Sequence, residues 1–481
     1  MINFRPIARV VAILWMIVGV LMWTGVPFSV YYEEDPKPLL IAGFITMVLG
    51  GLAFLVKNPR GVPIRKREGY LIVVLSWAAM ISAGMLPYLL SGVIPTIPEA
   101  LFETVSGMTT TGASVLTDIE IQPRGILYWR SLTQWIGGMG IIVLTVAVFP
   151  LLGIGGIELF AAEAPGPTSD KLHPRISETA KRLWFIYVGL TVTLFFVLWA
   201  FGMNKYESIN HALTTMATGG FSTRNASAAA FSPQIQYVLI LFMFLAGVNY
   251  TVLYLSFKRR FLDVWKSEEL KTYLLIVGGL VSFFTLKIYL ATGVPVEQAF
   301  RDGAFQIVSL ITTTGFVSAD YTSWATSLTI ICFVLLFIGA CAGSTSGGIK
   351  LIRHLVFVKN SYLEFKRIVH PSAIVPLRLN QEVVAGKIIT HVFNFLLLYL
   401  LIFVVGSVML AMMGLDFMTA LGAMATSLGN VGPGIGDVGP VDNFAWLPSH
   451  IKVFLAGVMI IGRLEIYTVL VLFTPFFWRL N

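Results

Sequence analysis

Four short tracts rich in threonine and serine each end on a glycine, and they are the best candidates for chemistry in this sequence. They span residues 109–112, 216–219, 312–315 and 426–429. A dehydrated cation needs a cage of oxygen ligands, which backbone carbonyls and threonine hydroxyls supply. The near-regular spacing indicates one repeated unit, so the tracts predict a ring of carbonyl oxygens that strips water from a cation.

The candidate ligands are the tract glycines and their neighbours. They are Thr110, Thr111, Gly112, Thr218, Gly219, Thr313, Thr314, Gly315, Leu428, Gly429 and Asn430. Glycine lacks a Cβ, so its backbone can turn a carbonyl toward a common axis. One Thr-x-Gly is more often a loop turn or a helix contact, but four in phase are not explained that way. Phe316 follows the third glycine directly, whereas Phe221 comes one residue later in the second tract.

The first three tracts lack the second glycine of a TVGYG filter. We therefore expect a short filter with few ion sites in series. Its cation selectivity should be less stringent than that of a tetrameric potassium channel.

An acidic residue precedes each tract glycine by 12 or 13 positions: Glu99, Glu207, Asp302 and Asp416. Each apolar stretch between acid and glycine would rise only about 18 Å as a helix, too little to cross a bilayer. We predict re-entrant pore helices at about 98–110, 206–217, 302–312 and 416–426, with each acid at the positive end of the helix dipole. Capping of a loop helix explains each acid alone but not their recurrence.

A run of small residues interrupts a predicted span at positions 339–350. Glycine and small hydroxyl residues weaken a helix by up to about 1 kcal/mol each, so we expect a broken helix here. We interpret it as a gate below the filter, with a small-residue packing face as the alternative. A phosphate loop is disfavoured, since Ile349 separates Gly348 from Lys350 and no Ser or Thr follows. The candidate gate residues are Gly343, Ser344, Thr345, Ser346, Gly347, Gly348 and Lys350.

Arg463 is predicted to lie about midway along the last span. A charge at the bilayer centre costs on the order of 2.5–3.5 kcal/mol, so the side chain should face the pore or a partner. Our hypothesis is that Arg463 projects beneath the filter as an electrostatic barrier and meets the loop 343–348. The alternative is a salt bridge between helices. Glu465 lies on another helix face and is not its natural partner within the helix.

The composition determines the setting of these residues. Of 481 residues, 56% are hydrophobic and only 12% are charged, with a mean hydropathy of +0.81. Spanning a hydrocarbon core takes about 20 apolar residues. Ten stretches reach or approach that length: 10–32, 39–56, 69–98, 131–157, 183–204, 225–257, 272–296, 321–349, 388–415 and 453–478.

We therefore predict an all-α polytopic membrane protein. Two leading transmembrane helices (1–67) precede four span–pore-helix–span repeats in a pseudo-fourfold arrangement. The repeats occupy residues 68–165, 166–266, 267–378 (with a broken second span) and 379–481.

The connections between spans differ in charge. Basic residues cluster in alternate connections, which the positive-inside rule places in the cytoplasm together with both termini. All four tracts then fall on the outer side. The net charge of +8 reflects mostly this bias, with docking of an acidic cytoplasmic partner as the alternative to lipid contact. No basic face away from the membrane is visible for nucleic acid. The first span lacks a cleavage site and is predicted to be retained.

The sequence does not favour an enzyme. The histidines (His173, His211, His354, His370, His391 and His450) are scattered without metal-ligand spacing. Ser344 and Ser346 have no His or Lys base at a telling position. Cys332 and Cys341, nine residues apart in one predicted helix, are expected to be apolar packing residues.

The sequence resembles bacterial TrkH-type (TrkH/TrkG-like) subunits of the Trk, Ktr and HKT potassium transporters. The resemblance lies in the four repeats, the two extra leading spans and the motifs at 342–350 and 462–466. The resemblance covers essentially the whole chain. It implies potassium translocation across the bacterial inner membrane, with the tract glycines as filter residues, 343–348 as an intramembrane gate and Arg463 beside it. In related proteins a glycine at the first filter position goes with potassium and a serine with sodium, so Gly112 favours potassium. Ser346 replaces an expected glycine.

The same resemblance implies partners. It predicts a homodimer with one pore per protomer and a cytoplasmic ring of TrkA-type nucleotide-binding subunits. ATP, ADP or NADH would act only through that ring, and no tightly bound organic cofactor is expected. The alternative function is a symporter that couples sodium or a proton to potassium, for which Glu465 and Asp437 are the candidate carboxylates.

Overall fold

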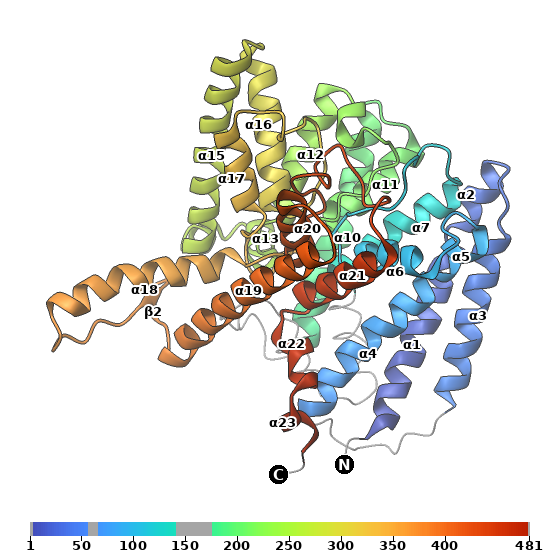
Figure 1. Ribbon diagram of the computed structural model, residues 1–481, viewed down its shortest axis with the longest axis horizontal. Coiled ribbons are helices and arrows are strands. Elements are labelled where there is room, and N and C mark those ends of the chain that lie inside the picture. The colour runs from blue at the N-terminus through green and yellow to red at the C-terminus, as the bar shows by residue number, and fades with distance from the viewer. Residues whose placement is uncertain (1–2, 56–65, 141–175, 480–481) are drawn as a thin grey trace.

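The computed structural model describes residues 3–55, 66–140 and 176–479. Helices make up most of this part of the chain, with irregular loops between them (Figure 1). Its one small sheet pairs β1 (Arg378–Leu379) antiparallel with β2 (Glu382–Val383). The predicted all-α membrane architecture is confirmed.

Six helical segments in the described residues are long and apolar enough to cross a membrane. They are Phe4–Tyr31, Lys37–Phe54, Arg67–Ser91, Lys181–Ala200, Glu268–Thr292 and Gly386–Met412. Four of these bury only 22–33% of their apolar window inside the protein. Exposed apolar side chains such as Leu275 and Leu397, which are 75% and 69% exposed, therefore form a lipid-facing surface.

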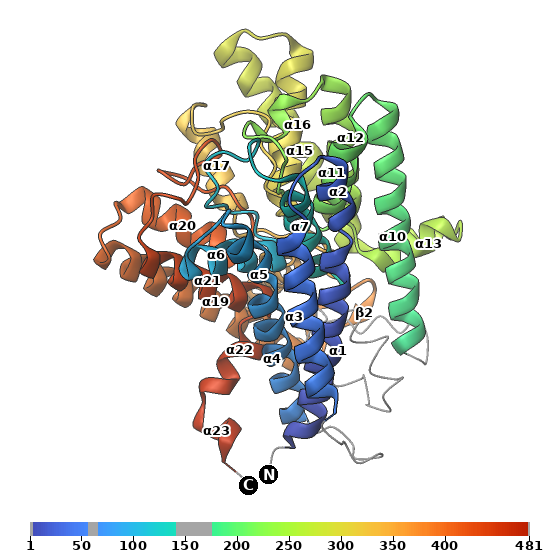
Figure 2. The ribbon, with the colours of Figure 1, turned by 90° about the vertical axis from the view of Figure 1, so that its right-hand side faces the viewer.

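Two leading helical segments precede the repeats. The first consists of α1 (Phe4–Trp23) and α2 (Val26–Tyr31), and α3 (Lys37–Phe54) runs back along α1 (Figures 1 and 2). The start of α1 and the last helix, α23 (Pro475–Trp478), lie at the same end of the molecule.

Each repeat has a first span, a pore helix and a second span. The first repeat contains α4 (Lys66–Gly84), α5 (Leu86–Ser91), α6 (Ile97–Met108), α7 (Arg124–Trp135) and η1 (Ile136–Gly140). The second contains α10 (Ile176–Ala200), α11 (Lys205–Met216), η2 (Ser227–Ala230), α12 (Pro233–Ala246), α13 (Tyr250–Phe257) and α14 (Phe261–Val264). The third contains α15 (Glu268–Thr292), α16 (Val296–Ile311), α17 (Thr326–Leu335) and α18 (Leu351–Val369), and the fourth contains α19 (Gly386–Met412), α20 (Phe417–Gly429), α21 (Ser449–Arg463), α22 (Tyr467–Leu470) and η3 (Val471–Phe473).

The second spans of the second and fourth repeats are not the continuous helices that the sequence predicted, whereas the break predicted in the third is present. α12 and α13 meet at 104°, and α21 meets the segment Tyr467–Phe473 at 110°. The predicted span 321–349 contains only the ten-residue α17, followed by irregular backbone up to α18. The predicted span 131–157 passes outside the described residues at position 141. Irregular backbone at this depth is tolerated where it is buried in protein or lines a cavity.

The pore helices begin close to three of the four predicted acids. Glu99 and Glu207 lie in the first turns of α6 and α11. Asp416 caps α20 by accepting hydrogen bonds from the backbone of Met418 and Thr419 at 3.0 and 3.1 Å. Hydrogen bonds from Thr419 hold the pKa of the Asp416 carboxyl below its usual value.

The prediction for the third pore helix is wrong. α16 starts directly after Pro295, at Val296, so Asp302 is its seventh residue and Glu297 occupies the first turn. Proline is disfavoured inside a helix but compatible with its start, and the residues between Pro295 and Asp302 continue the helix without a breaker.

Close packing of α1 on α3 leads to a stability prediction. A Cβ on Gly50 would lie 2.7 Å from the Ala12 carbonyl oxygen and 2.8 Å from Met16 Cγ, whereas one on the adjacent Gly51 would meet nothing within 4 Å. Gly50→Leu is therefore expected to push the helices apart, with a loss of about 1–3 kcal/mol. In thermal unfolding of the detergent-solubilised protein, Gly50→Leu should lower Tm and Gly51→Leu should not. Equal Tm values would contradict this packing.

Candidate cation site and gate

The four loops that follow the pore helices share one backbone conformation. A non-glycine residue with positive φ ends each helical turn: Thr110, Thr218, Thr313 and Asn430, with φ of 55°, 53°, 53° and 53°. Two residues later comes a positive-φ glycine: Gly112, Gly220, Gly315 and Gly432. Left-handed backbone is rare outside glycine, so its recurrence at one spacing shows that the loops are structurally equivalent.

This equivalence differs from the register read from the sequence tracts. Gly220 and Gly432, rather than Gly219 and Gly429, occupy the position of Gly112 and Gly315. Gly429 is still the last residue of α20. Phe221 then aligns with Phe316, which removes the asymmetry noted in the sequence. The spacing is set by the left-handed residue and not by the end of a threonine run.

The four loops close into a ring. Each positive-φ glycine lies against a backbone carbonyl oxygen of the next loop. That oxygen belongs to the residue directly before the positive-φ glycine of the next loop. An added Cβ on Gly112 would lie 2.2 Å from the Gly219 oxygen, and one on Gly220 would lie 2.0 Å from the Thr314 oxygen. An added Cβ on Gly315 would lie 2.0 Å from the Val431 oxygen, and one on Gly432 would lie 2.8 Å from the Thr111 oxygen. The order one, two, three, four and back to one shows that the loops surround a common axis.

The predicted filter residues fall into two groups. Nine of them lie in the ring or directly below it, namely Thr110, Thr111, Gly112, Thr218, Gly219, Thr313, Thr314, Gly315 and Asn430. Asn430 Nδ2 donates to Thr111 Oγ1 at 2.9 Å, which joins the fourth loop to the first. Leu428 and Gly429 lie outside the ring: an added Cβ on Gly462 would lie 2.2 Å from the Leu428 oxygen, and one on Gly347 would lie 2.6 Å from the Gly429 oxygen.

A cavity lies on each side of the ring. All four ring glycines line the first cavity, together with the charged side chains of Arg130, Arg224 and Asp442. The second cavity is lined by the predicted gate residues from Ser344 to Gly348 and by Lys350, Arg463 and Glu465. The ring thus lines the first cavity and the loop lines the second, and the bond from Gly347 N to Thr313 Oγ1 joins ring and loop.

The predicted gate segment forms a loop at the inner ends of the pore helices. Gly343 and Gly348 have φ of 70° and 64°, so both take the left-handed conformation that glycine allows. Thr345 Oγ1 donates to the Met216 carbonyl at the end of α11 at 3.1 Å. Gly347 N donates to Thr313 Oγ1 at 2.6 Å. The loop thus contacts residues of the ring directly.

Arg463 ends α21 and lies against this loop. Its guanidinium donates to the Thr345 carbonyl at 3.0 Å and to the Gly137 and Gly138 carbonyls at 2.8 and 3.0 Å. The expected contact between Arg463 and the loop is therefore present, but at a helix end rather than in mid-helix. Lys350 donates to the carbonyl and, at 3.1 Å, to the hydroxyl of Ser346.

Glu465 has a different partner. It pairs with Arg353 of α18 at 2.5 Å. The break between α21 and α22 is thereby tied to the helix that follows the loop.

Sequence reasoning missed three buried polar residues behind the first two loops. Glu103 lies in the middle of α6, and Arg130 and Gln134 lie on α7. Gln134 Nε2 donates to the Gly219 carbonyl at 2.6 Å, and its Oε1 accepts from Phe221 N at 3.1 Å. A signal for two of them was available, because charged residues in apolar intramembrane segments are rare and functional.

Other chemistry finds less support in the part of the chain that the structure describes. There, no group of three or more His, Cys, Asp or Glu is arranged to hold a metal ion. Cys332 and Cys341 are buried free thiols. They do not share one helix as predicted, because α17 ends at Leu335.

The register of the second loop can be tested with alanine. A Cβ on Gly220 would lie 2.0 Å from the Thr314 carbonyl at φ 75°, whereas one on Gly219 would chiefly meet the flexible Gln134 side chain. Gly220→Ala should therefore reduce cation flux by more than Gly219→Ala. Equal losses for the two single variants in a liposome flux assay would contradict the structural register.

Comparison with known proteins places these features in a family. A family model described as "TrkH: Cation transport protein" matches residues 37–480. The Trk system potassium uptake protein TrkH of Escherichia coli K12 is 38% identical over 487 residues, covering 99% of this chain and 100% of the relative. TrkG of the same organism, also a Trk system potassium uptake protein, is 34% identical over 94% of each chain. The crystal structure of the potassium transporter TrkH from Vibrio parahaemolyticus superposes with a TM-score of 0.89 at 35% identity, covering 99% of this chain and 100% of that one.

Proposed function

Because the chain belongs to the TrkH family of cation transport proteins, we propose that it carries potassium ions into the cell through the ring formed by its four pore loops. It is a transporter and not an enzyme. The observation that supports this proposal best is the closed contact of each ring glycine with a carbonyl of the next loop. Such a ring offers a bare cation main-chain oxygens in place of its water shell.

In this proposal the carbonyls of Thr111, Gly219, Thr314 and Val431 are the first candidates for ion ligands, because each lies at a contact between neighbouring loops. The threonine residues below them supply further oxygens. Gly112 stands where a serine goes with sodium in related proteins, which favours potassium here. The negative ends of the four pore-helix dipoles add an attractive potential without a buried carboxylate at the axis.

The loop from Gly343 to Gly348 is proposed to be the gate. It lies directly under the ring, and its Gly347 nitrogen is bonded to Thr313 of the filter region. Arg463 donates to the loop carbonyl of Thr345 and lines the same cavity, so it places a positive charge below the ring. Opening would require the loop to move away from the axis, with Arg463 controlling both its position and the local potential.

The assembly is proposed on the same basis. The relatives are named as components of a Trk system, which supports regulation by TrkA-type nucleotide-binding subunits in the cytoplasm. We infer a homodimer in the bacterial inner membrane with one pore per protomer and both termini in the cytoplasm. α18 and the β1–β2 hairpin extend away from the pore helices (Figure 1), in the region where a cytoplasmic partner could reach the gate.

The direct test is ion flux through purified protein in liposomes. We expect potassium flux that follows the potassium gradient alone, with less sodium flux under an equal gradient. Empty liposomes are the control. Absence of potassium flux above this control would overturn the proposal. Flux that needs a sodium or proton gradient would instead identify the symporter for which Glu465 and Asp437 are candidates.

A further inference from the structure

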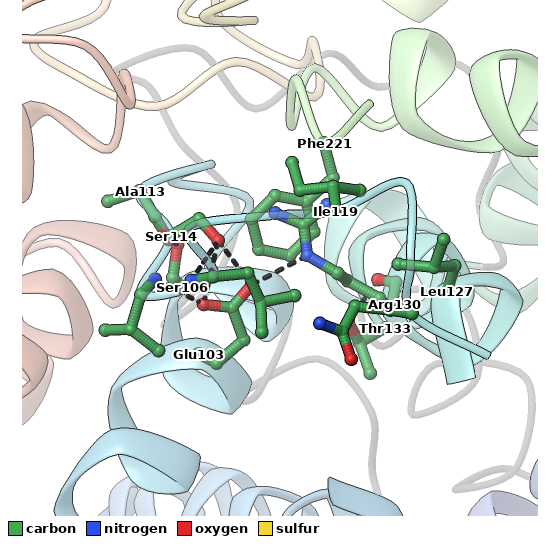
Figure 3. A network of polar contacts seen from close by, with 12 residues as sticks. Glu103, Ser106, Ala113, Ser114, Ile119, Leu127, Arg130, Thr133 and Phe221 are labelled. Carbon is green, nitrogen blue, oxygen red and sulfur yellow. Dashed lines mark hydrogen bonds and ion pairs between the residues drawn. The ribbon is translucent and has the colours of Figure 1, made fainter. Parts of the chain in front are cut away.

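A buried ion pair lies directly behind the first two pore loops (Figure 3). Arg130 Nε is 2.7 Å from Glu103 Oε1, and the side chains are 3% and 0% exposed. Removing two charges from water costs desolvation energy that their mutual attraction often does not exceed. Stability alone is therefore a weak reason for a buried ion pair at this position.

Glu103 holds the first loop just beyond its ring glycine. Its carboxylate accepts hydrogen bonds from Val115 N at 2.8 Å and from Ser114 Oγ at 3.0 Å (Figure 3). On the same stretch, Ser106 Oγ donates to the Ala113 carbonyl at 2.5 Å. The three residues that follow Gly112 are thus each bonded to α6. The position of Gly112 itself depends on these contacts.

Arg130 holds the second loop at the equivalent place. One terminal nitrogen donates to the Ser222 carbonyl at 3.1 Å. The guanidinium carbon lies 3.4 Å from the centre of the Phe221 ring, as a cation–π contact (Figure 3). Phe221 and Ser222 directly follow Gly220. A single ion pair therefore connects the exits of loops one and two, and the spacing of these loops helps to set the size of the ring.

The charge of Arg130 also matters, because this residue lines the same cavity as the four ring glycines. An unpaired guanidinium there would repel an approaching cation. The other charged residues that line the cavity are Asp442 and Arg224, and Arg224 is paired with Glu207 at 2.6 Å and Glu120 at 3.3 Å. Glu103 is thus the group that neutralises Arg130 at the mouth of the ring.

We propose that Glu103 and Arg130 are positioning residues for ion selectivity. Together they fix the spacing of loops one and two, and Glu103 keeps the charge of Arg130 from opposing cation entry. This inference rests on the proposed potassium pathway. It assigns to one buried pair two separable effects, a geometric effect on selectivity and an electrostatic effect on flux.

Three variants of the full-length protein in liposomes separate these effects: Glu103→Gln, Arg130→Gln and the double variant. Glu103→Gln leaves an unpaired cation at the mouth, so potassium flux should fall about tenfold. Arg130→Gln releases the second loop, so the ratio of potassium to sodium flux should fall about threefold or more. In the double variant the positive charge is gone; flux should therefore exceed that of Glu103→Gln while the ion ratio stays low.

A matched control removes a carboxylate elsewhere on a pore helix. Glu297→Gln breaks the ion pair between Glu297 and Arg301 on α16, and neither residue lines either cavity. This variant should leave the potassium flux and the ratio of potassium to sodium flux unchanged. A wild-type ratio of potassium to sodium flux in Arg130→Gln and in the double variant would overturn the inference. These two variants still test the positioning role if Glu103→Gln does not fold. A double variant no faster than Glu103→Gln would overturn the electrostatic part. Absence of potassium flux in the wild type would instead refute the proposed function.

Discussion

Serine in place of Gly315 is expected to abolish potassium uptake. The Cβ would lie 2.0 Å from the Val431 carbonyl oxygen and 3.0 Å from Pro433 Cδ, on a backbone with φ of 78°. Either the third loop or the fourth must then shift by about 1 Å, in addition to about 1–3 kcal/mol of backbone strain. A displacement of that size at a preorganised site can reduce function about 100-fold. The measurement is growth of a potassium-uptake-deficient cell at limiting potassium, followed by liposome flux.

The matched control is Gly457→Ser in the same chain. A Cβ on Gly457 meets nothing within 4 Å, and its φ is not positive. This variant should grow like the wild type. Gly112→Ser, whose Cβ would meet the Gly219 carbonyl at 2.2 Å, should fail like Gly315→Ser. Full growth of both ring variants at limiting potassium would argue strongly against a filter at these glycines.

Replacing Arg463 with glutamine is expected to raise the basal potassium flux. The change removes a positive charge below the ring and weakens the bonds to the carbonyls of Thr345, Gly137 and Gly138. A fixed charge near an ion in a partly buried pathway contributes on the order of 1–2 kcal/mol. We therefore expect roughly a tenfold increase in flux without the cytoplasmic partner.

The controls separate charge from loop position. Arg463→Lys keeps the charge but loses the planar donor geometry, so its flux should be intermediate. Lys359→Gln on α18 removes an equal charge from a residue paired with Glu268, away from both cavities, and should not change flux. Unaltered flux in Arg463→Gln would refute the pore role of this residue.

The fold could be predicted from the sequence where the signal is local. Hydropathy identifies the long spans such as α15 and α19, since a membrane requires continuous apolar runs. The short apolar segments before the tracts identify α6, α11 and α20, because twelve helical residues cannot cross a bilayer. Among the second spans, a break was predicted only at 339–350. In the bend between α21 and α22, the residues with positive φ are Glu465 and Ile466, whose types do not indicate a turn.

The details of the site depend on contacts that sequence does not show. The glycine register differed in loops two and four because each holds an earlier glycine, Gly219 or Gly429, at the end of its tract, whereas the ring glycine comes two residues after Thr218 or Asn430. Pairing of Glu103 with Arg130 joins residues 27 positions apart, and Gln134 reaches a carbonyl 85 positions away. Such long-range partners are set by tertiary packing and not by local propensity.

The measurement that tests the account most directly is anomalous diffraction from crystals soaked in rubidium, which takes the place of potassium. We expect a rubidium peak on the axis of the ring, between the first and second cavities. This peak should lie within direct coordination distance of the carbonyl oxygens of Thr111, Gly219, Thr314 and Val431. Rubidium bound elsewhere at saturating concentration, with no peak inside the ring, would contradict it.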